Sequence, residues 1–292
     1  MDIPSDAVSL VAHRYRLPAL LQDIRLLDLL EISGTSLEVS RLCGISQPTI
    51  SRRTRALAQD FGLEINRHRP VGCCYGTSPA MRLLRLGCRA HRLAAGVARL
   101  GTDGLLQPLL APGIDLLPCP PRFRPVASWL ELLRQGVLDG ALISGLELGE
   151  ATPAPGDGLE LLPVGEWPLE LAMAPEQVIP FGSLPPVLVP HRAATAGLQR
   201  QLQQRGLVLR TTGHACQMPI QWRQRLQQKA VAMPMLQRAP DPCWQGLRRV
   251  ALPSPLALPL WLALPTDWQE HPVLRHTAQE LRRMGGLQQL EG

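Results

Sequence analysis

The sequence predicts an α/β protein in which an all-helical head precedes a larger body of alternating strands and helices. Three observations support this prediction. Apolar residues recur at helical spacing from about residue 20, and capping residues divide that stretch into short helices. From about residue 97, short apolar runs alternate with amphipathic helices. The whole net charge of +6 belongs to residues 1–100, because residues 101–292 hold equal numbers of acidic and basic side chains.

The composition fits a globular protein of 292 residues with a mainly aliphatic core, since 45% of the residues are hydrophobic and 4% are aromatic. An excess of positive charge that is confined to the first third predicts a polyanion-binding module joined to a neutral body. The alternative is an ordinary arginine-rich surface. Seven cysteines without regular spacing favour reduced thiols and a cytoplasmic location. We expect neither a signal peptide nor a membrane span, because prolines interrupt the apolar run "PSPLALPLWLALPT".

Start and stop signals predict three helices in the head. The periodic segment "LLQDIRLLDLLEIS" ends at Gly34. Thr35 and Glu38 have the spacing of a capping box, which predicts a short second helix. After a glycine-containing turn, Ser46 is the expected N-cap of a third helix, and Pro48 is tolerated in its first turn. This order of helix, short helix, turn and helix is that of a helix-turn-helix.

The third helix has two faces of different chemistry. Ile50, Thr54, Leu57 and Phe61 form the face expected to pack inward. The opposite face would enter the major groove of DNA, where Arg can bind guanine and Gln can bind adenine. The alternative is a surface helix whose arginines are only solvated. The residues expected to contact DNA are Ser46, Gln47, Pro48, Thr49, Ser51, Arg52, Arg55 and Gln59.

The segment "LEVSRLCGISQPTISRRTRALAQDFG" resembles the winged helix-turn-helix of LysR-type transcriptional regulators. The resemblance implies that Arg67 in "EINRHR" begins the wing and that Arg67 and Arg69 contact backbone or minor groove. "GTSPA" at residues 76–80 is similar to the start of the family's linker helix. Departures lie at Ala58, at Asn66 and in an approach to the wing that is one residue short. The matching residues of the DNA-reading stretch are Ser46, Gln47, Pro48, Thr49, Ser51 and Arg52.

Residues 78–96 predict a linker helix with Ser78 as its cap. Two adjoining apolar stripes indicate a broad apolar surface, with Arg82, Arg85, Arg89 and Arg92 beside it. We expect this surface to pair with a second copy of the chain, as in the resembled family, giving a homodimer or homotetramer that reads two half-sites. The alternative is packing against its own chain.

In the body, "LRQGVLDGALI" resembles a signature of the LysR-type effector domain, which has a periplasmic-binding-protein-like fold of two subdomains. The expected boundaries are 17–77 for the winged helix-turn-helix, 78–96 for the linker helix and 97–292 for the effector domain. Subdomain I would hold about 97–163 and 257–292, and subdomain II about 164–256. Alternating strands and helices predict a mostly parallel sheet. The segment 101–114 looks too short for a full first helix.

In such a fold a small-molecule effector sits outside the carboxyl ends of the strands. Arg192 would favour an anionic effector, whereas Asp103 would oppose one or pair with an amine. Taken alone, each candidate is better explained as a loop or capping residue than as a ligand contact, and the set depends on analogy with the fold. The candidates at strand ends are Thr102, Asp103, Ser144, His191, Arg192, Thr211 and Thr212.

No cofactor, metal or catalytic motif is expected. Cys73, Cys74, Cys88 and His91 have no zinc-binding spacing. The resemblance therefore implies a cytoplasmic, non-enzymatic regulator that binds double-stranded DNA and an unidentified small-molecule effector. The rival reading is a small-molecule-binding protein or enzyme whose head no longer binds DNA.

Overall fold

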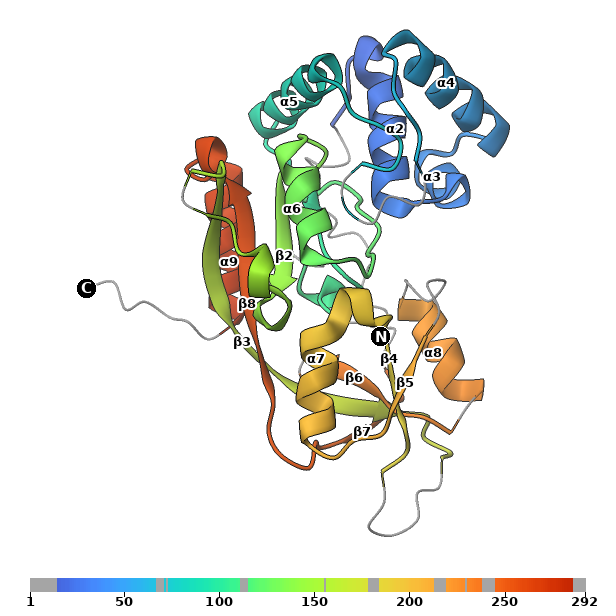
Figure 1. Cartoon of the computed structure of the whole chain (residues 1–292), viewed down its shortest axis with the longest axis vertical. Coiled ribbons are helices and arrows are strands. Elements are labelled where there is room, and N and C mark those ends of the chain that lie inside the picture. The colour runs from blue at the N-terminus through green and yellow to red at the C-terminus, as the bar shows by residue number, and fades with distance from the viewer. Residues whose placement is uncertain are drawn as a thin grey trace, which may run out of the picture.

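The structure, a computed structural model, describes residues 15–66, 71, 73–110, 115–154, 156–177, 184–212, 219–228, 230–237 and 245–285. Three parts are stacked along the long axis in Figure 1. The head helices lie at the top, a subdomain with α6, β2 and α9 lies in the middle, and a subdomain with α7 and α8 lies at the bottom. The prediction of an α/β protein with an all-helical head is confirmed.

The head contains a 3-10 turn η1 (Ala19–Leu21) and three helices, α2 (Gln22–Ser33), α3 (Ser36–Cys43) and α4 (Gln47–Asp60). Gly34 ends α2 with a left-handed φ of 72°, a conformation that glycine adopts without strain. Thr35 caps α3 by accepting a hydrogen bond from the Glu38 N–H, as predicted. Ser46 occupies the N-cap position of α4, but its hydroxyl pairs with the Thr49 hydroxyl at 2.9 Å and caps no N–H group.

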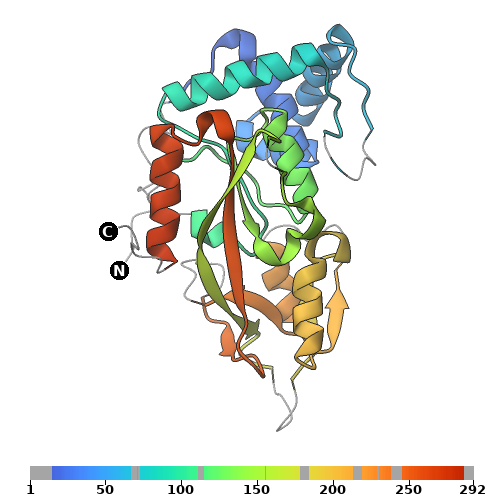
Figure 2. The ribbon, with the colours of Figure 1, turned by 60° about the vertical axis from the view of Figure 1, so that its left-hand side comes forward.

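The linker helix is α5 (Pro79–Ala94), and Ser78 caps it by accepting a hydrogen bond from the Met81 N–H. In Figure 2, α5 (turquoise) lies across the upper edge of the body, beside the head helices. The prediction of an outward apolar surface on this helix is only partly confirmed. Leu83 is 70% exposed, but most of the arginines face inward. Buried aspartates on both sides explain this orientation, and pairing with a second copy stays a prediction. The buried residues of α5 are Met81, Arg85, Cys88, Arg89, Arg92 and Leu93.

The main sheet has the order β1-β2-β8-β3-β6, and β7 also pairs with β3. The prediction of a mostly parallel sheet is wrong for this sheet. Its long central strands β3 and β8 run antiparallel, because together they carry the chain from the middle subdomain to the lower one and back. The strands are β1 (Leu100–Gly101), β2 (Gly140–Ser144), β3 (Leu159–Met173), β6 (Met233–Leu236), β7 (Arg248–Val250) and β8 (Ala257–Pro265).

Among the strands that the structure describes, β1 pairs in parallel with β2, and β4 (Val187–Val189) pairs in parallel with β5 (Leu209–Thr211) in a small second sheet. Two isolated parallel bridges add to these, Ala98 with Leu116 and Val187 with Ala232. The boundary expected at 163/164 falls inside β3, beside an irregularity between Pro163 and Gly165. Where a first body helix would stand, the described residues form a 3-10 turn, η2. The remaining helical elements are η2 (Gln107–Leu110), α6 (Val126–Arg134), η3 (Gly145–Glu147), η4 (Gly149–Ala151), α7 (Arg192–Gln204), α8 (Pro219–Gln228), η6 (Thr266–Trp268) and α9 (Pro272–Met284).

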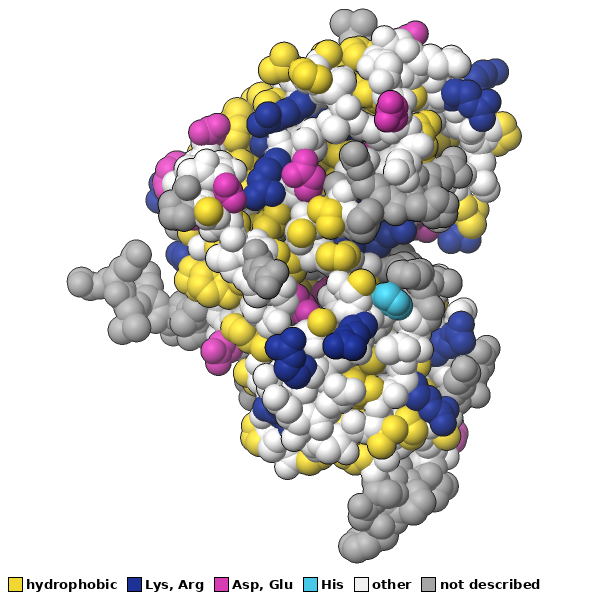
Figure 3. All heavy atoms as spheres, in the orientation of Figure 1, with side chains coloured by type: hydrophobic (Ala, Val, Ile, Leu, Met, Phe, Trp, Pro, Cys, Tyr) yellow, Lys and Arg dark blue, Asp and Glu magenta, His cyan; other side chains and the backbone are white. Residues whose placement is uncertain are grey.

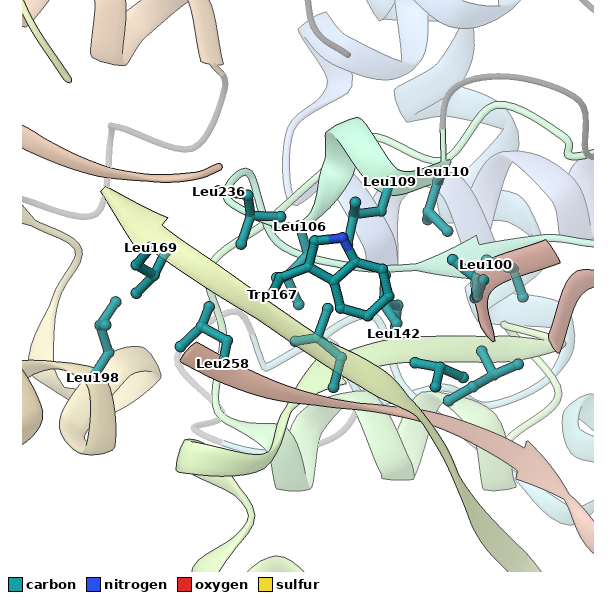
Figure 4. Packing of buried hydrophobic residues seen from close by; sticks show 14 of the residues in the cluster. Leu100, Leu106, Leu109, Leu110, Leu142, Trp167, Leu169, Leu198, Leu236 and Leu258 are labelled. Atoms are coloured by element: carbon teal, nitrogen blue, oxygen red, sulfur yellow. The ribbon is translucent and has the colours of Figure 1, made fainter. Parts of the chain in front are cut away.

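The core of the body is aliphatic, with Trp167 of β3 at its centre. Figure 4 shows leucines from several elements around the indole ring, among them Leu106, Leu142 and Leu258. These three leucines are at most 1% exposed, and their burial contributes to the stability of the cluster that both subdomains share. Within the described ranges, no helix has both the length and the apolar character needed to cross a bilayer.

A close backbone approach joins the subdomains beside this core. The Glu147 carboxylate of η3 accepts hydrogen bonds from the Gly197 and Leu198 N–H groups of α7, at 2.9 and 2.7 Å. A Cβ atom on Gly197 would lie 1.9 Å from the Leu146 carbonyl oxygen, so only glycine permits this approach.

We expect Gly197→Ala to lower the free energy of unfolding by about 1–3 kcal/mol, because α7 must move away from η3. Gly87→Ala is the matched control, since Gly87 lies within α5 with open space around its Cα. There, alanine should stabilise the chain by up to about 1 kcal/mol. Urea unfolding measures both, and two changes of the same sign would contradict this account.

Candidate nucleic-acid interface and ligand pocket

The two faces of α4 differ as the sequence predicts. Ile50, Thr54 and Ala58 are buried against the head core. Pro48, Arg52, Arg55 and Gln59 are exposed. Figure 3 shows basic side chains on the outer surface over α4, at the upper right. A cationic edge on a helix of 14 residues has the shape and charge that suit the major groove.

Neighbouring contacts fix α4 and leave its outer arginines available. Arg53 pairs with Asp23 of α2, which holds the flank of the helix. Gln47 accepts a hydrogen bond from the Ser36 hydroxyl at 3.3 Å, so its carboxamide oxygen is already engaged at the start of α3. In the part of the chain that the structure describes, Arg52 and Arg55 form no ion pair. Their charges are therefore not neutralised there and can contact phosphates or bases.

The predicted wing is described only at its base, and Arg67 and Arg69 lie outside the described residues. The Asn66 N–H donates to the Cys74 carbonyl at 2.8 Å, which joins the two arms of the segment. The Glu31 carboxylate of α2 accepts hydrogen bonds from the Cys74 and Tyr75 N–H groups at 2.7 and 2.6 Å. Burial raises the pKa of Glu31 to about 7, against the opposing effects of Arg85 and these two N–H groups.

A buried ionic network joins the head, α5 and the body. Arg85 of α5 donates to Asp28 of α2 at 2.8 Å, and Arg99 lies 3.6 Å from the same carboxylate. Arg92 of α5 donates to Asp139 at 2.6 Å, and this carboxylate also accepts the Arg99 N–H at 2.7 Å. Burial alone would raise the pKa of Asp139, but Arg92 and its neighbours lower it below the ordinary value.

The network holds more arginines than aspartates, and backbone carbonyls offset the difference. Arg89 donates to the carbonyls of Leu133 and Leu138, and Arg92 donates to the carbonyl of Gly136. These carbonyls lie at or just beyond the C-terminal end of α6, where the helix dipole favours positive charge. The buried guanidinium groups of α5 therefore cap α6. The sequence signal for this network was the pair of acids in the apolar stretch "LLDLLEIS", which sequence reasoning did not use.

A second set of arginines caps α2 from the body. Arg122 donates to the Ser33 carbonyl. Arg124 donates to the Glu31 and Ile32 carbonyls at 3.0 and 2.8 Å. Between them, Phe123 meets Trp222 edge to face, with ring centroids 5.6 Å apart. Three consecutive residues thus touch the last turn of the head's first helix on one side and α8 on the other.

Phe123 and Trp222 also line a pocket between the two subdomains. The space between its walls is about 280 Å³, including the part open to solvent. Among the residues that the structure describes, the walls carry no ionisable side chain. They are formed by Gly104, Leu105, Phe123, Pro190, Leu198, Trp222, Met233 and Pro234.

None of the residues predicted to contact an effector lines this pocket, although several are adjacent to it in sequence. Asp103 precedes Gly104, and its carboxylate caps the following turn by accepting the Leu105 and Leu106 N–H groups. Burial raises the pKa of Asp103 to about 6. His191 follows Pro190 and accepts the Ala193 N–H at the start of α7.

The other predicted effector residues are dispersed. Thr102 is buried and donates to the Leu142 carbonyl at 2.9 Å, and Ser144 accepts the Leu146 N–H. Arg192 and Thr211 are exposed, and Thr212 is buried. Their contact with an effector stays a prediction. Within the described ranges, no three His, Cys, Asp or Glu side chains gather as metal ligands could.

Comparison with known proteins finds no matching family model and no matching curated protein. Solved structures of LysR-family transcriptional regulators match most of the chain. HinK from Pseudomonas aeruginosa is 16% identical, with 92% of this chain and 99% of that chain covered and a TM-score of 0.44. CbnR in complex with its target DNA is 15% identical, with 90% and 99% covered and a TM-score of 0.49. LysG from Corynebacterium glutamicum with bound effector Arg is 17% identical, with 91% and 98% covered and a TM-score of 0.45.

Asp28→Asn tests the ionic network. It leaves Arg85 and Arg99 buried without a counter-charge, so the free energy of unfolding should fall by about 3–5 kcal/mol. Asp23→Asn, on the same helix, removes a partly exposed pair with Arg53 and should cost at most about 1 kcal/mol. Urea unfolding compares the two variants. Equal losses of unfolding free energy would show that the buried ion pairs of Asp28 stabilise the chain no more than the exposed pair of Asp23.

Glu31 predicts a pH dependence of stability. The ordinary pKa of 4.5 rises to about 7 on folding, so between these values the folded chain holds a proton that the unfolded chain has released. The stabilisation is complete below about pH 4.5 and is lost as pH rises through about 7, amounting to about 3 kcal/mol at about 1.4 kcal/mol per pKa unit. Glu31→Gln should flatten this slope, whereas Glu64→Gln, at an exposed site in the head, should leave it unchanged. Chemical unfolding across pH 4–8 measures the slope.

Proposed function

We propose that the chain is a LysR-type transcriptional regulator that binds specific double-stranded DNA through α4 and is controlled by a small-molecule effector bound in the body. The observation that carries the proposal is that Arg52 and Arg55 are exposed and have no ion-pair partner among the described residues, on a helix whose other face is fixed in the head core. A merely solvated basic helix would not need the capped turn and the buried face that aim it outward. The predicted match of Ser46–Arg52 to the family's DNA-reading stretch supports the same assignment.

The pocket between the subdomains supports the effector half of the proposal. Ligand sites are concave and mainly apolar, and they occur at interfaces between structural units. The walls around Phe123 and Trp222 have these properties. Further parts of the proposal are a cytoplasmic location and a homodimer or homotetramer that presents two heads to two half-sites. The rival reading, a binding protein or enzyme with a vestigial head, keeps the pocket but gives α4 no role.

A salt titration with selected DNA separates the two readings. Duplexes enriched from a random library by the full chain are titrated by fluorescence anisotropy between 50 and 300 mM KCl. Each neutralised phosphate contributes about −0.9 to the slope of log affinity against log salt, so a reading dimer should give a slope of about −5 or steeper. Shallow, sequence-independent binding would support the vestigial head.

Substitutions on α4 test which residues read the bases. Arg52→Ala and Arg55→Ala should each weaken binding to the selected duplex by about 5- to 100-fold, because each removes a contact of about 1–3 kcal/mol. The loss on a scrambled duplex should be much smaller. Arg275→Ala, at an exposed position on α9 far along the chain, is the matched control and should leave both affinities unchanged. Equal losses on both duplexes would assign these arginines to phosphates.

A further inference from the structure

The described walls of the pocket between the subdomains carry no charged side chain. Its eight lining residues are glycine, proline, leucine, methionine, phenylalanine and tryptophan. Arg122 and Arg124, which flank the lining residue Phe123 in the chain, are engaged with carbonyls of α2. A charged ligand would lose its hydration here without gaining an ionic partner, which is strongly unfavourable. The pocket therefore selects against ions.

One polar group of the wall has no partner. Trp222 is 2% exposed, and its indole N–H has no hydrogen-bond acceptor among the described residues. A buried donor without an acceptor is costly, and a ligand with one acceptor atom would remove that cost. The volume of about 280 Å³, which includes the open mouth, limits the ligand to about one ring with a short substituent.

The pocket is coupled to the head by covalent connection. Phe123 lines it, and the residues on either side hold the last turn of α2 through its carbonyls. The segment is anchored behind by the Arg122 N–H, which donates to the Thr102 carbonyl at 3.0 Å, and by the Arg124 guanidinium, which lies 4.7 Å from the Trp129 ring centroid. Consecutive Cα atoms are only 3.8 Å apart, so Phe123 cannot move far without its neighbours.

We propose that this pocket binds an uncharged, mainly apolar small molecule with one hydrogen-bond acceptor, and that residues 122–124 transmit its binding to α2. Occupancy separates Phe123 from Trp222 and shifts the two arginine caps together. The second part of this proposal, transmission to α2, rests on the proposed function, because transmission to α2 matters only if the head binds DNA. The ligand half does not depend on DNA binding.

Three probes of similar size test the ligand half on the full chain without DNA: acetophenone, toluene and benzoate. Ligand-observed NMR titration should show acetophenone binding at least about 10-fold more tightly than benzoate. Trp222→Phe keeps an aromatic ring but removes the N–H together with part of the indole, so it should weaken acetophenone about 2- to 10-fold more than it weakens toluene. Tighter binding of benzoate, or an unchanged affinity of Trp222→Phe for acetophenone, would overturn the assignment.

Hydrogen exchange tests the transmission half, again without DNA. Saturating acetophenone should change the exchange rate of amides at the C-terminal end of α2 by at least about threefold. Arg124→Met and Arg122→Met should abolish this change while still binding acetophenone, which also shows that they fold. Arg134→Met, on the outer side of α6, is the control and should retain it. A change that persists in both variants excludes this route, and absent DNA binding alone would count only against the regulator assignment.

Discussion

The carboxylate of Asp28 is the constraint on which the position of the head depends. It lies 1% exposed on α2 and faces Arg85 of α5 and Arg99 at the start of the body. A buried charge that loses its partner retains the full cost of its desolvation. The head therefore cannot swing away from α5 unless this ion pair opens and water enters. Asp139 performs the corresponding task on the body side, where Arg92 meets it, so α5 is held from both ends of the network.

Backbone carbonyls at the C-terminal ends of helices accept hydrogen bonds from the remaining buried guanidinium groups. Arginines of α5 donate to carbonyls at the end of α6, and arginines of the 122–124 segment donate to carbonyls at the end of α2. Each structural unit thus caps a helix of the other. The net positive charge of the N-terminal third is therefore not all available for binding DNA. Arg85, Arg89, Arg92 and Arg99 contribute to its charge, yet all are at most 3% exposed and serve packing. The positive charge available to DNA is correspondingly smaller and includes the exposed Arg52 and Arg55 of α4.

Local signals determined what the sequence could predict. Thr35, Gly34 and the alternating faces of α4 are contained within a few residues, and the structure has them as expected. Strand β3 was missed because Pro163, Gly165 and Pro168 interrupt its pattern, and its pairing with β8 depends on residues about a hundred positions away. The effector candidates shared one difficulty. Short polar side chains such as Asp103 and Ser144 accept hydrogen bonds from nearby N–H groups, whereas apolar residues form the described walls of the pocket, so contact between these candidates and an effector stays a prediction.

Two kinds of contact hold α2: the buried ion pairs of Asp28 and the hydrogen bonds from arginines to its last carbonyls. They differ in the free energy needed to break them, so Asp28 can serve as a fixed point about which the C-terminal end of α2 moves. At Asp28, paired charges are fully buried, so separating them is costly and the contact stays fixed. One turn later, the Glu31, Ile32 and Ser33 carbonyls accept from guanidinium groups that can shift while keeping a hydrogen bond, which costs little. The same end of α2 holds the base of the predicted wing through Glu31, and α2 packs against α4. A small displacement at the arginine caps is thus transmitted to both surfaces expected to contact DNA, while the Asp28 network prevents the head from detaching.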